Sequence, residues 1–400
     1  MSGSQPSQSV ITPWNNDQLT ADAMASAELL RQGVPYSQII YDANISPTFG
    51  SPMTISVSPN AVGLIRRFLV QVDVTVTNPA GGSTLTRSTS WGPFNTLSNI
   101  TYTDPNTQQR VNTSGSHLAS LATRRGRRVA GSAWTSDSPS GFGSVLSPIK
   151  APATIAANTT ATVSTIYEIP ISLGAATCKA AVFAGAVFST QQLQLTFNSM
   201  FATAGSTSGD GLFSVYTGSG SGANAPTFSA RIRVTQEYLD GFDLNLLTMM
   251  SPSLSMIYEL KSTSYSQIQA NADFYIRFTN LRTFLSLGLA YVNNGVLNAG
   301  TDIREFGMMQ VNQTKLWFRD PQLHSWFTRN LIGADYPPGN YLFDFSDRPV
   351  STAASGNTIL YFNPITAVSA VAYVNWEALA TQQVLASAPS LDGSSGGQGR

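Results

Sequence analysis

The sequence predicts an all-β protein made of two tandem eight-stranded jelly rolls, with a short N-terminal helix and small helices in long loops. Three observations predict this architecture. Apolar and polar residues alternate with a period of two from residue 52 onward, the pattern begins again near residue 250, and the 400 residues exceed what one hydrophobic core usually covers. Spaced strands joined by long connections favour jelly rolls over a simple up-and-down barrel.

The same patterns divide the chain into four parts. Residues 1–50 are expected to form an N-terminal arm with an amphipathic helix, and residues 51–248 the first jelly roll. Residues 249–385 are expected to form the second jelly roll. Residues 386–400 end in GSSGGQGR and hold no core-forming side chains, so a disordered C-terminal tail is predicted there.

The arm carries the clearest helix signal in the chain. Asn16 or Asp17 can cap the helix, and Gly33 and Pro35 end it. Its apolar positions recur at helical spacing at Leu19, Ala23, Ala27 and Leu30. The polar face lacks the basic residues that anionic bilayers attract, so docking against protein is favoured over binding to lipid. We therefore predict that this helix is an assembly arm, which adjusts how neighbouring copies meet.

In the first half, alternating segments predict strands between residues 53 and 239. They lie at 53–57, 68–76, 83–89, 97–103, 160–171, 192–198 and 230–239. The connection 104–148 is expected to hold a short helix near residues 116–123. The connection 202–226 is rich in Gly, Ser and Thr, which predicts an exposed loop.

The second half repeats this organisation. Strands are predicted at 254–260, 274–280, 283–292, 340–345, 358–362 and 370–377. The long connection 295–338 contains LWF at 316–318 and HSWF at 324–327, more aromatic residues than a solvated loop tolerates. Part of it is therefore expected to pack, as a short helix.

The charge content is unusually low. Only 11% of the residues are charged, and 22 basic residues balance 22 acidic ones. A soluble monomer ordinarily carries about twice that share. No apolar stretch approaches the roughly 20 residues of a membrane-spanning helix, and the N-terminus lacks a secretory signal. We infer a soluble protein whose neutral outer faces are covered by other copies of the chain.

One dense run of positive charge interrupts this neutrality. It consists of Arg124, Arg125, Arg127 and Arg128. Such a cluster could contact nucleic acid, but the zero net charge and the distance to the nearest aromatic residue, Trp134, argue against it. The preferred interpretation is a basic loop at an interface, which pairs with acidic residues of an adjacent copy.

The sequence offers little for catalysis or for a cofactor. His117 and His324 lie in different halves without partners at ligand spacing, and Cys178 is the single cysteine. Asp335, Asp344 and Asp347 could gather a hard cation, but they lack Ca²⁺-loop spacing and are better explained as turn and strand-end residues. No catalytic residue, bound metal or cofactor is expected.

Several short segments, in this order and spacing, carry a family resemblance. They are SPNAVG at 58–63, TDPN at 103–106, TSGSHL at 113–118, APATIAA at 151–157, NAGTDI at 298–303, ADYPPG at 334–339 and DRP at 347–349. With these segments the chain resembles the tectivirus-type double jelly-roll major capsid proteins of tailless icosahedral phages with an internal membrane. The resemblance runs from about residue 17 to residue 377 and covers both predicted jelly rolls.

The resemblance implies a structural role and no enzymatic activity. Three chains would form a pseudo-hexagonal homotrimer, and trimers would tile an icosahedral shell around a membrane vesicle that encloses the genome. The implied partners are neighbouring trimers, vertex (penton) and minor capsid proteins, and the viral membrane near the inner face. Sequence-specific nucleic-acid binding is not implied, and assembly would take place in the host cytoplasm.

Two other classes of function stay open from the residues alone. The first is a glycan-binding β-sandwich, such as a spike or a surface lectin, which would share the polar strands and the exposed aromatic side chains. The second class, which is more remote, is a β-sandwich hydrolase. It would require paired acidic residues in a cleft, which one sequence cannot locate.

Overall fold

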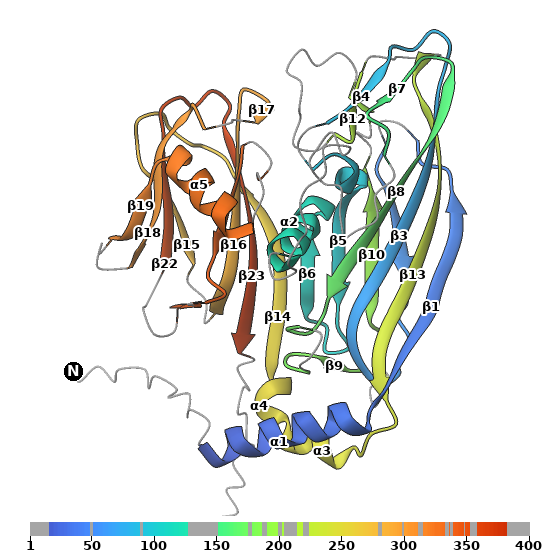
Figure 1. Cartoon of the computed structure of the whole chain (residues 1–400), viewed down its shortest axis with the longest axis vertical. Coiled ribbons are helices and arrows are strands. Elements are labelled where there is room, and N and C mark those ends of the chain that lie inside the picture. The colour runs from blue at the N-terminus through green and yellow to red at the C-terminus, as the bar shows by residue number, and fades with distance from the viewer. Residues whose placement is uncertain are drawn as a thin grey trace, which may run out of the picture.

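The computed structural model shows two β-sandwiches side by side, with helix α1 lying across the base of the first (Figure 1). It describes residues 16–48, 51–88, 91–126, 151–174, 178–185, 190–198, 202–203, 214–218, 224–278, 282–297, 300–310, 315–332, 336, 339–347, 349–352 and 358–381. None of the helices among them is long and apolar enough to cross a membrane.

The first sandwich packs a 5-stranded sheet against four further strands. The sheet has the order β1 (Val34–Ile45), β13 (Thr227–Asp240), β3 (Leu64–Asn78) and β8 (Thr159–Pro170), with β9 (Val182–Phe183) beside β3. The facing strands have the order β2 (Met53–Val57), β10 (Gln192–Phe197), β5 (Leu97–Thr103) and β6 (Gln109–Thr113). All these pairings are antiparallel, as a jelly roll requires.

The second sandwich repeats this strand order. One layer holds β14 (Met256–Tyr265), β23 (Val371–Thr381), β16 (Arg282–Asn293) and β20 (Asn340–Asp344), with the short β17 (Val296–Leu297) and β21 (Val350–Ser351) beside β16. The other layer is a 4-stranded sheet with the order β15 (Phe274–Phe278), β22 (Thr358–Pro364), β18 (Ile303–Gln310) and β19 (Lys315–Arg319). Matching the two orders makes β14 the counterpart of β1, and β19 the counterpart of β6.

The two sandwiches share one sheet. Strand β6 of the first runs parallel to β14 of the second, with Val111 opposite Leu260 and Asn112 opposite Lys261. This pairing makes a 10-stranded sheet that continues through both halves of the chain. The two jelly rolls are therefore joined by backbone hydrogen bonds as well as by the linker that precedes β14.

The helices and a small sheet occupy the ends of the sandwiches and the junction between them. The helices are α1 (Asn16–Gln32), α2 (Gly115–Gly126), α3 (Asn245–Met249), α4 (Ser251–Leu254), α5 (Pro321–Ile332) and the 3-10 helix η1 (Gly92–Thr96). A 4-stranded sheet at the top of the first roll consists of β4 (Leu85–Arg87), β7 (Thr154–Ile155), β11 (Ala202–Thr203) and β12 (Tyr216–Thr217) (Figure 1).

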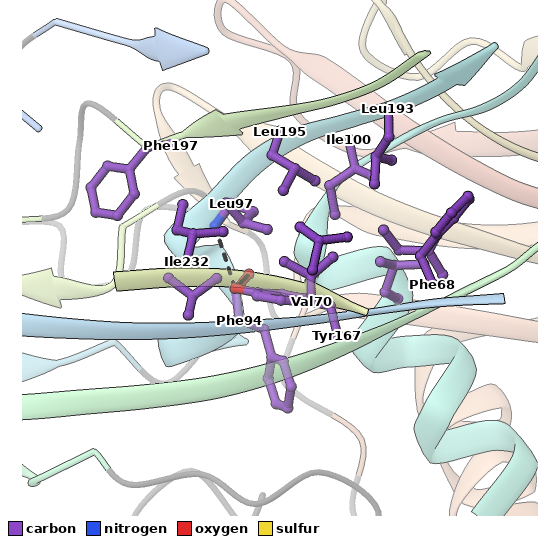
Figure 2. Packing of buried hydrophobic residues seen from close by; sticks show 14 of the residues in the cluster. Phe68, Val70, Phe94, Leu97, Ile100, Tyr167, Leu193, Leu195, Phe197 and Ile232 are labelled. Carbon is purple, nitrogen blue, oxygen red and sulfur yellow. Dashed lines mark hydrogen bonds between the residues drawn. The ribbon is translucent and has the colours of Figure 1, made fainter. Parts of the chain in front are cut away.

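The core of the first roll follows directly from the alternating sequence of β3. Val70, Val72, Val74 and Val76 are fully buried, while the residues between them are half-buried. Tyr167 crosses this layer from β8, and its hydroxyl donates a hydrogen bond of 2.9 Å to the carbonyl of Phe94 (Figure 2). Burial of β-branched side chains on one strand face is what holds the two layers together.

The second core is more aromatic. Phe306, Phe362 and Tyr291 are fully buried, and the rings of Tyr291 and Phe362 lie 5.7 Å apart in an edge-to-face contact. His324 of α5 packs edge-to-face on Phe306 at 4.9 Å. The aromatic residues of the 295–338 connection therefore do pack, and residues 321–332 form the helix expected there.

The predicted fold class and most of the predicted strands are confirmed, but four regions differ. Residues 34–45, assigned to the arm, form strand β1 at the edge of the first sheet. Strands β6, β18 and β19 lie in segments predicted as connections. In the 202–226 connection, Val215 and Tyr216 are buried rather than exposed. The predicted tail at 386–400 lies outside the described residues.

Candidate assembly surfaces and the junction of the two rolls

Helix α1 docks on the base of the first roll through a face other than the predicted one. Its buried residues are Ala25 and Leu29, which pack in a cluster with Leu64, Leu239 and Met250. The predicted positions Leu19, Ala23 and Ala27 are exposed, and Leu30 is partly buried against the same cluster. The helix is rich in alanine, so its periodicity alone could not decide which stripe faces the protein.

Polar contacts attach α1 to the linker between the rolls. The carboxylate of Asp22 accepts hydrogen bonds from the hydroxyl of Ser253 at 2.7 Å and from its backbone N–H at 3.1 Å. Gln32 Oε1 accepts the backbone N–H of Asp243 at 3.0 Å. The described part of the arm is therefore part of the folded unit, with Leu19 and Met24 left on its outer side at 46% and 68% exposure.

The predicted basic interface loop requires a correction. Arg124 and Arg125 belong to helix α2, and Arg124 is 6% exposed. Arg124 Nη1 donates to Asp344 Oδ1 at 3.0 Å, and its Nη2 donates to Glu377 Oε2. These carboxylates belong to the second roll of the same chain and not to an adjacent copy. Arg127 and Arg128 lie outside the described residues.

Glu377 is the centre of a buried polar network at the junction. Its Oε1 accepts hydrogen bonds from Tyr258 Oη at 2.5 Å and from Arg125 Nη2 at 3.2 Å, and Arg125 also donates to Tyr258 at 2.8 Å. Burial by itself would raise the pKa of Glu377, but Arg124, Arg125 and the Tyr258 hydroxyl lower that pKa below its usual value. The carboxylate is therefore ionised and compensated by two guanidinium groups.

Apolar and hydrogen-bonded contacts extend the same junction. Tyr258, Leu260 and Leu285 of the second roll belong to the hydrophobic cluster of the first roll. Trp91 Nε1 donates to Asn340 Oδ1 at 3.0 Å, and the Ser120 hydroxyl bonds to that of Tyr336. Local sequence patterns do not reveal this junction, because the partners on its two sides lie more than 130 residues apart along the chain.

The two histidines are separate, buried and neutral. Burial lowers the pKa of His117 to about 3, and its Nδ1 lies 2.6 Å from Thr113 Oγ1. Burial lowers the pKa of His324 to about 4, and its Nε2 lies 2.8 Å from the carbonyl of Leu342. These environments suit structural residues better than proton-transfer catalysts.

The other candidate ligands are likewise dispersed. Cys178 is buried, which raises the pKa of its thiol to about 11. Asp344 accepts a hydrogen bond from Arg124, while Asp335 lies outside the described residues. Within the described ranges, no three His, Cys, Asp or Glu residues are grouped so that they could hold a metal ion.

Two exposed apolar surfaces lie on different rolls (Figure 1). The first is on β1, where Val34, Tyr36 and Ile39 are between 47% and 55% exposed. The second is on α5, where Leu323, Trp326 and Phe327 are between 41% and 57% exposed. Such aromatic and aliphatic surfaces mark contact sites more often than ordinary solvent-facing regions.

Comparison with known proteins places this architecture in a family. The model for the N-terminal part of the P3 major capsid protein matches residues 23–242, and the model for its C-terminal part matches residues 255–391. The chain belongs to the P3 major capsid protein family. It is 31% identical to major capsid protein P3 of Enterobacteria phage PRD1 over 357 residues, which cover 88% of this chain and 89% of that relative.

Solved structures agree with the double jelly-roll fold. The crystal structure of the STIV major capsid protein aligns with a TM-score of 0.64 at 13% identity, covering 88% of this chain and all 100% of that one. In the atomic structure of Sulfolobus Turreted Icosahedral Virus, the matching chain gives a TM-score of 0.62 at 12% identity, with coverage of 87% and 91%. At this identity the likeness concerns the fold alone. The relationship of this chain to PRD1 P3, in contrast, rests on sequence identity.

Proposed function

We propose that this chain is a major capsid protein, a structural subunit that builds the shell of an icosahedral virus. The observation that carries the proposal is the family match across both jelly rolls, together with 31% identity to PRD1 P3. The low charge content supports it, because repeated contacts between copies cover surface that a monomer would need to keep solvated. The buried, neutral histidines are consistent with a role that involves no catalysis.

The finer assignment is a homotrimer of pseudo-hexagonal outline. Two rolls of similar strand order in each chain give six similar units in a ring of three chains. Such trimers would tile a shell around a membrane vesicle with the genome inside. They would contact neighbouring trimers, vertex (penton) proteins and minor capsid proteins, and would be assembled into virions in the host cytoplasm.

Mass measurement and electron microscopy of the purified full-length chain test this function. We expect stable particles with the mass of three chains, which appear as hexagonal blocks in negative stain. A protein that has the mass of one chain at all concentrations and is retained on an immobilised glycan column would contradict the proposal. That result would favour the glycan-binding alternative, in which the exposed aromatic side chains bind sugar.

The outer face of α1 is proposed to act between these building blocks. Leu19 and Met24 are exposed on a helix whose opposite face is docked. Changing Leu19→Asp should therefore leave fold and trimer unchanged but reduce the yield of closed shells. The measurement is the ratio of shells to free trimers after sedimentation, with Thr20→Asp on the same exposed turn as control. Equal shell yields for Leu19→Asp and wild type would refute an assembly role for the arm.

A further inference from the structure

A pocket on the first roll gathers three arginines from two separate elements. Arg66 and Arg67 come from β3 and Arg125 from the C-terminal end of α2, and Glu168 of β8 lies in the same lining. The pocket encloses an empty volume of about 260 Å³, part of which is open to solvent. Pockets for drug-sized ligands usually measure about 300–1,000 Å³. This arginine pocket therefore suits an ion or a single small headgroup.

A β-bulge brings two of the arginines to the same side. Along β3 and β13, Arg67 is paired with Glu237 and Ile65 with Tyr238, so Arg66 is the extra residue of the bulge. Neighbouring residues of a regular strand point to opposite faces. A bulge re-aims a side chain, and bulges are common next to functional sites. Here the bulge allows both Arg66 and Arg67 to line the arginine pocket.

Backbone hydrogen bonds hold the wall of the pocket in place. The carbonyl of Arg66 accepts the N–H of Ile171 at 2.9 Å and that of Ser172 at 3.1 Å. The N–H of Leu173 donates to the carbonyl of Lys179 at 2.9 Å. The segment after β8 is thus fixed against the bulge without any ligand, and a preorganised site loses less free energy on binding.

The three guanidinium groups differ in how they are compensated. Arg67 donates to Glu237 at 2.5 Å and to Glu168 at 3.1 Å. Arg125 uses only Nη2 for its bonds to Tyr258 and Glu377, so its Nε and Nη1 are without a partner in the described part of the chain.

Arg66 is the least compensated of the three. It is half-buried, and its guanidinium makes no hydrogen bond or ion pair with any described residue. Arginine stays protonated in proteins. Across the pocket, three cations therefore face the single carboxylate of Glu168, since Glu237 and Glu377 do not belong to the lining.

We propose that the arginine pocket binds a phosphate group between the guanidinium groups of Arg66 and Arg125. The fork of an arginine matches two oxygens of a phosphate, and a phosphate offers further oxygens to a second arginine from another direction. A bound phosphate would tie β3 to α2 directly beside the contact of Arg125 with Glu377 of the second roll. The pocket lies within one chain, so its occupancy is independent of the proposed function.

Calorimetric titration of the full-length chain with inorganic phosphate tests this site. We expect saturable binding of one phosphate per chain in the millimolar range, and no such binding of chloride at the same ionic strength. Phosphate also stabilises proteins in general because it is excluded from their surface. Variants, and not a rise in melting temperature, therefore decide the outcome.

Three substitutions separate a built site from general attraction to positive charge. Arg66→Gln should weaken phosphate binding by at least about tenfold, because a charge-assisted hydrogen bond is lost. Arg277→Gln is the matched control, since Arg277 is exposed on β15 and its loss removes the same charge without effect on binding. Glu168→Gln should strengthen binding, because it removes the carboxylate that repels phosphate.

Circular dichroism checks that each variant is folded. If Arg66→Gln fails this check, Arg66→Lys replaces it and should still weaken binding, because lysine keeps the charge but lacks the fork. Flotation with phosphatidylglycerol vesicles identifies the source of the phosphate group. Flotation of wild type but not of Arg66→Gln would assign a lipid headgroup, whereas binding of inorganic phosphate without flotation would assign a soluble anion.

Two results would overturn the phosphate site. The first is equal affinity of wild type and Arg66→Gln for phosphate. The second is a wild-type chain that binds neither inorganic phosphate nor the vesicles.

Discussion

Helices α2 and α5 occupy the same place in their jelly rolls but have very different surroundings. Both bury a histidine and a threonine: His117 and Thr123 in α2, and His324 and Thr328 in α5. In α2, His117 lies on the same side as Arg124, two turns further along the helix, and that side meets Glu377 of the second roll. In α5, the side away from His324 presents Trp326 to solvent. Helix α2 is thus covered by both rolls, whereas α5 is covered on one side.

The largest expected effect comes from breaking the ion cluster that only α2 has. In the Glu377→Gln variant, the guanidinium of Arg125 and the Nη2 group of Arg124 lose the buried carboxylate with which they pair. Removing one member of a buried ion pair costs about 3–5 kcal/mol, so the free energy of unfolding should fall by that amount in urea titrations. Glu28→Gln, which affects the exposed pair with Arg31, is the control and should show no resolvable change. Equal stability of Glu377→Gln and wild type would show that the junction does not depend on charge.

The same leucine truncation on both helices sharpens the comparison. Leu121 of α2 is 3% exposed and Leu323 of α5 is 43% exposed. Leu121→Ala should lower the free energy of unfolding by about 2–5 kcal/mol, as for other buried leucines. Leu323→Ala, measured under conditions in which the chain is monomeric, should change it by less than about 0.5 kcal/mol. Similar losses for both variants would mean that α5 is already covered within its own chain.

The two buried histidines predict a shared dependence of stability on pH. Their pKa values in the folded chain, about 3 for His117 and about 4 for His324, lie below the ordinary 6.5. At a pH between the folded and the ordinary pKa of a histidine, the unfolded chain binds a proton that the folded chain does not. The free energy of unfolding therefore keeps its full histidine contribution above pH 6.5 and falls as the pH is lowered below it.

Each histidine should contribute a slope of up to about 1.4 kcal/mol per pH unit in this range. His117→Gln and His324→Gln should each flatten the dependence by that amount, measured by urea unfolding between about pH 4.5 and pH 6. An unchanged slope in either variant would show that the histidine is not held neutral.

Local sequence patterns were sufficient for most of the fold. The alternation of Val70, Val72, Val74 and Val76 predicts β3 because one buried face imposes a period of two. Strand β1 was missed for a physical reason: its register shifts between Ile39 and Tyr41, and its first half is exposed, so neither face alternates clearly.

The junction could not be predicted from local patterns. Arg124 and Glu377 are 253 residues apart, and a run of arginines looks the same whether it faces solvent or a distant carboxylate. The arm helix was located correctly, but its docked face was not, because alanines on several sides leave the choice to the surface beneath Ala25 and Leu29. Tertiary partners, not periodicity, decide such cases.

The mass of the purified full-length chain in solution tests the central claim most directly, because the account holds that other copies of the chain cover its neutral surface. Analytical ultracentrifugation over a range of protein concentrations should give the mass of three chains. A mass of one chain at every concentration would contradict the account.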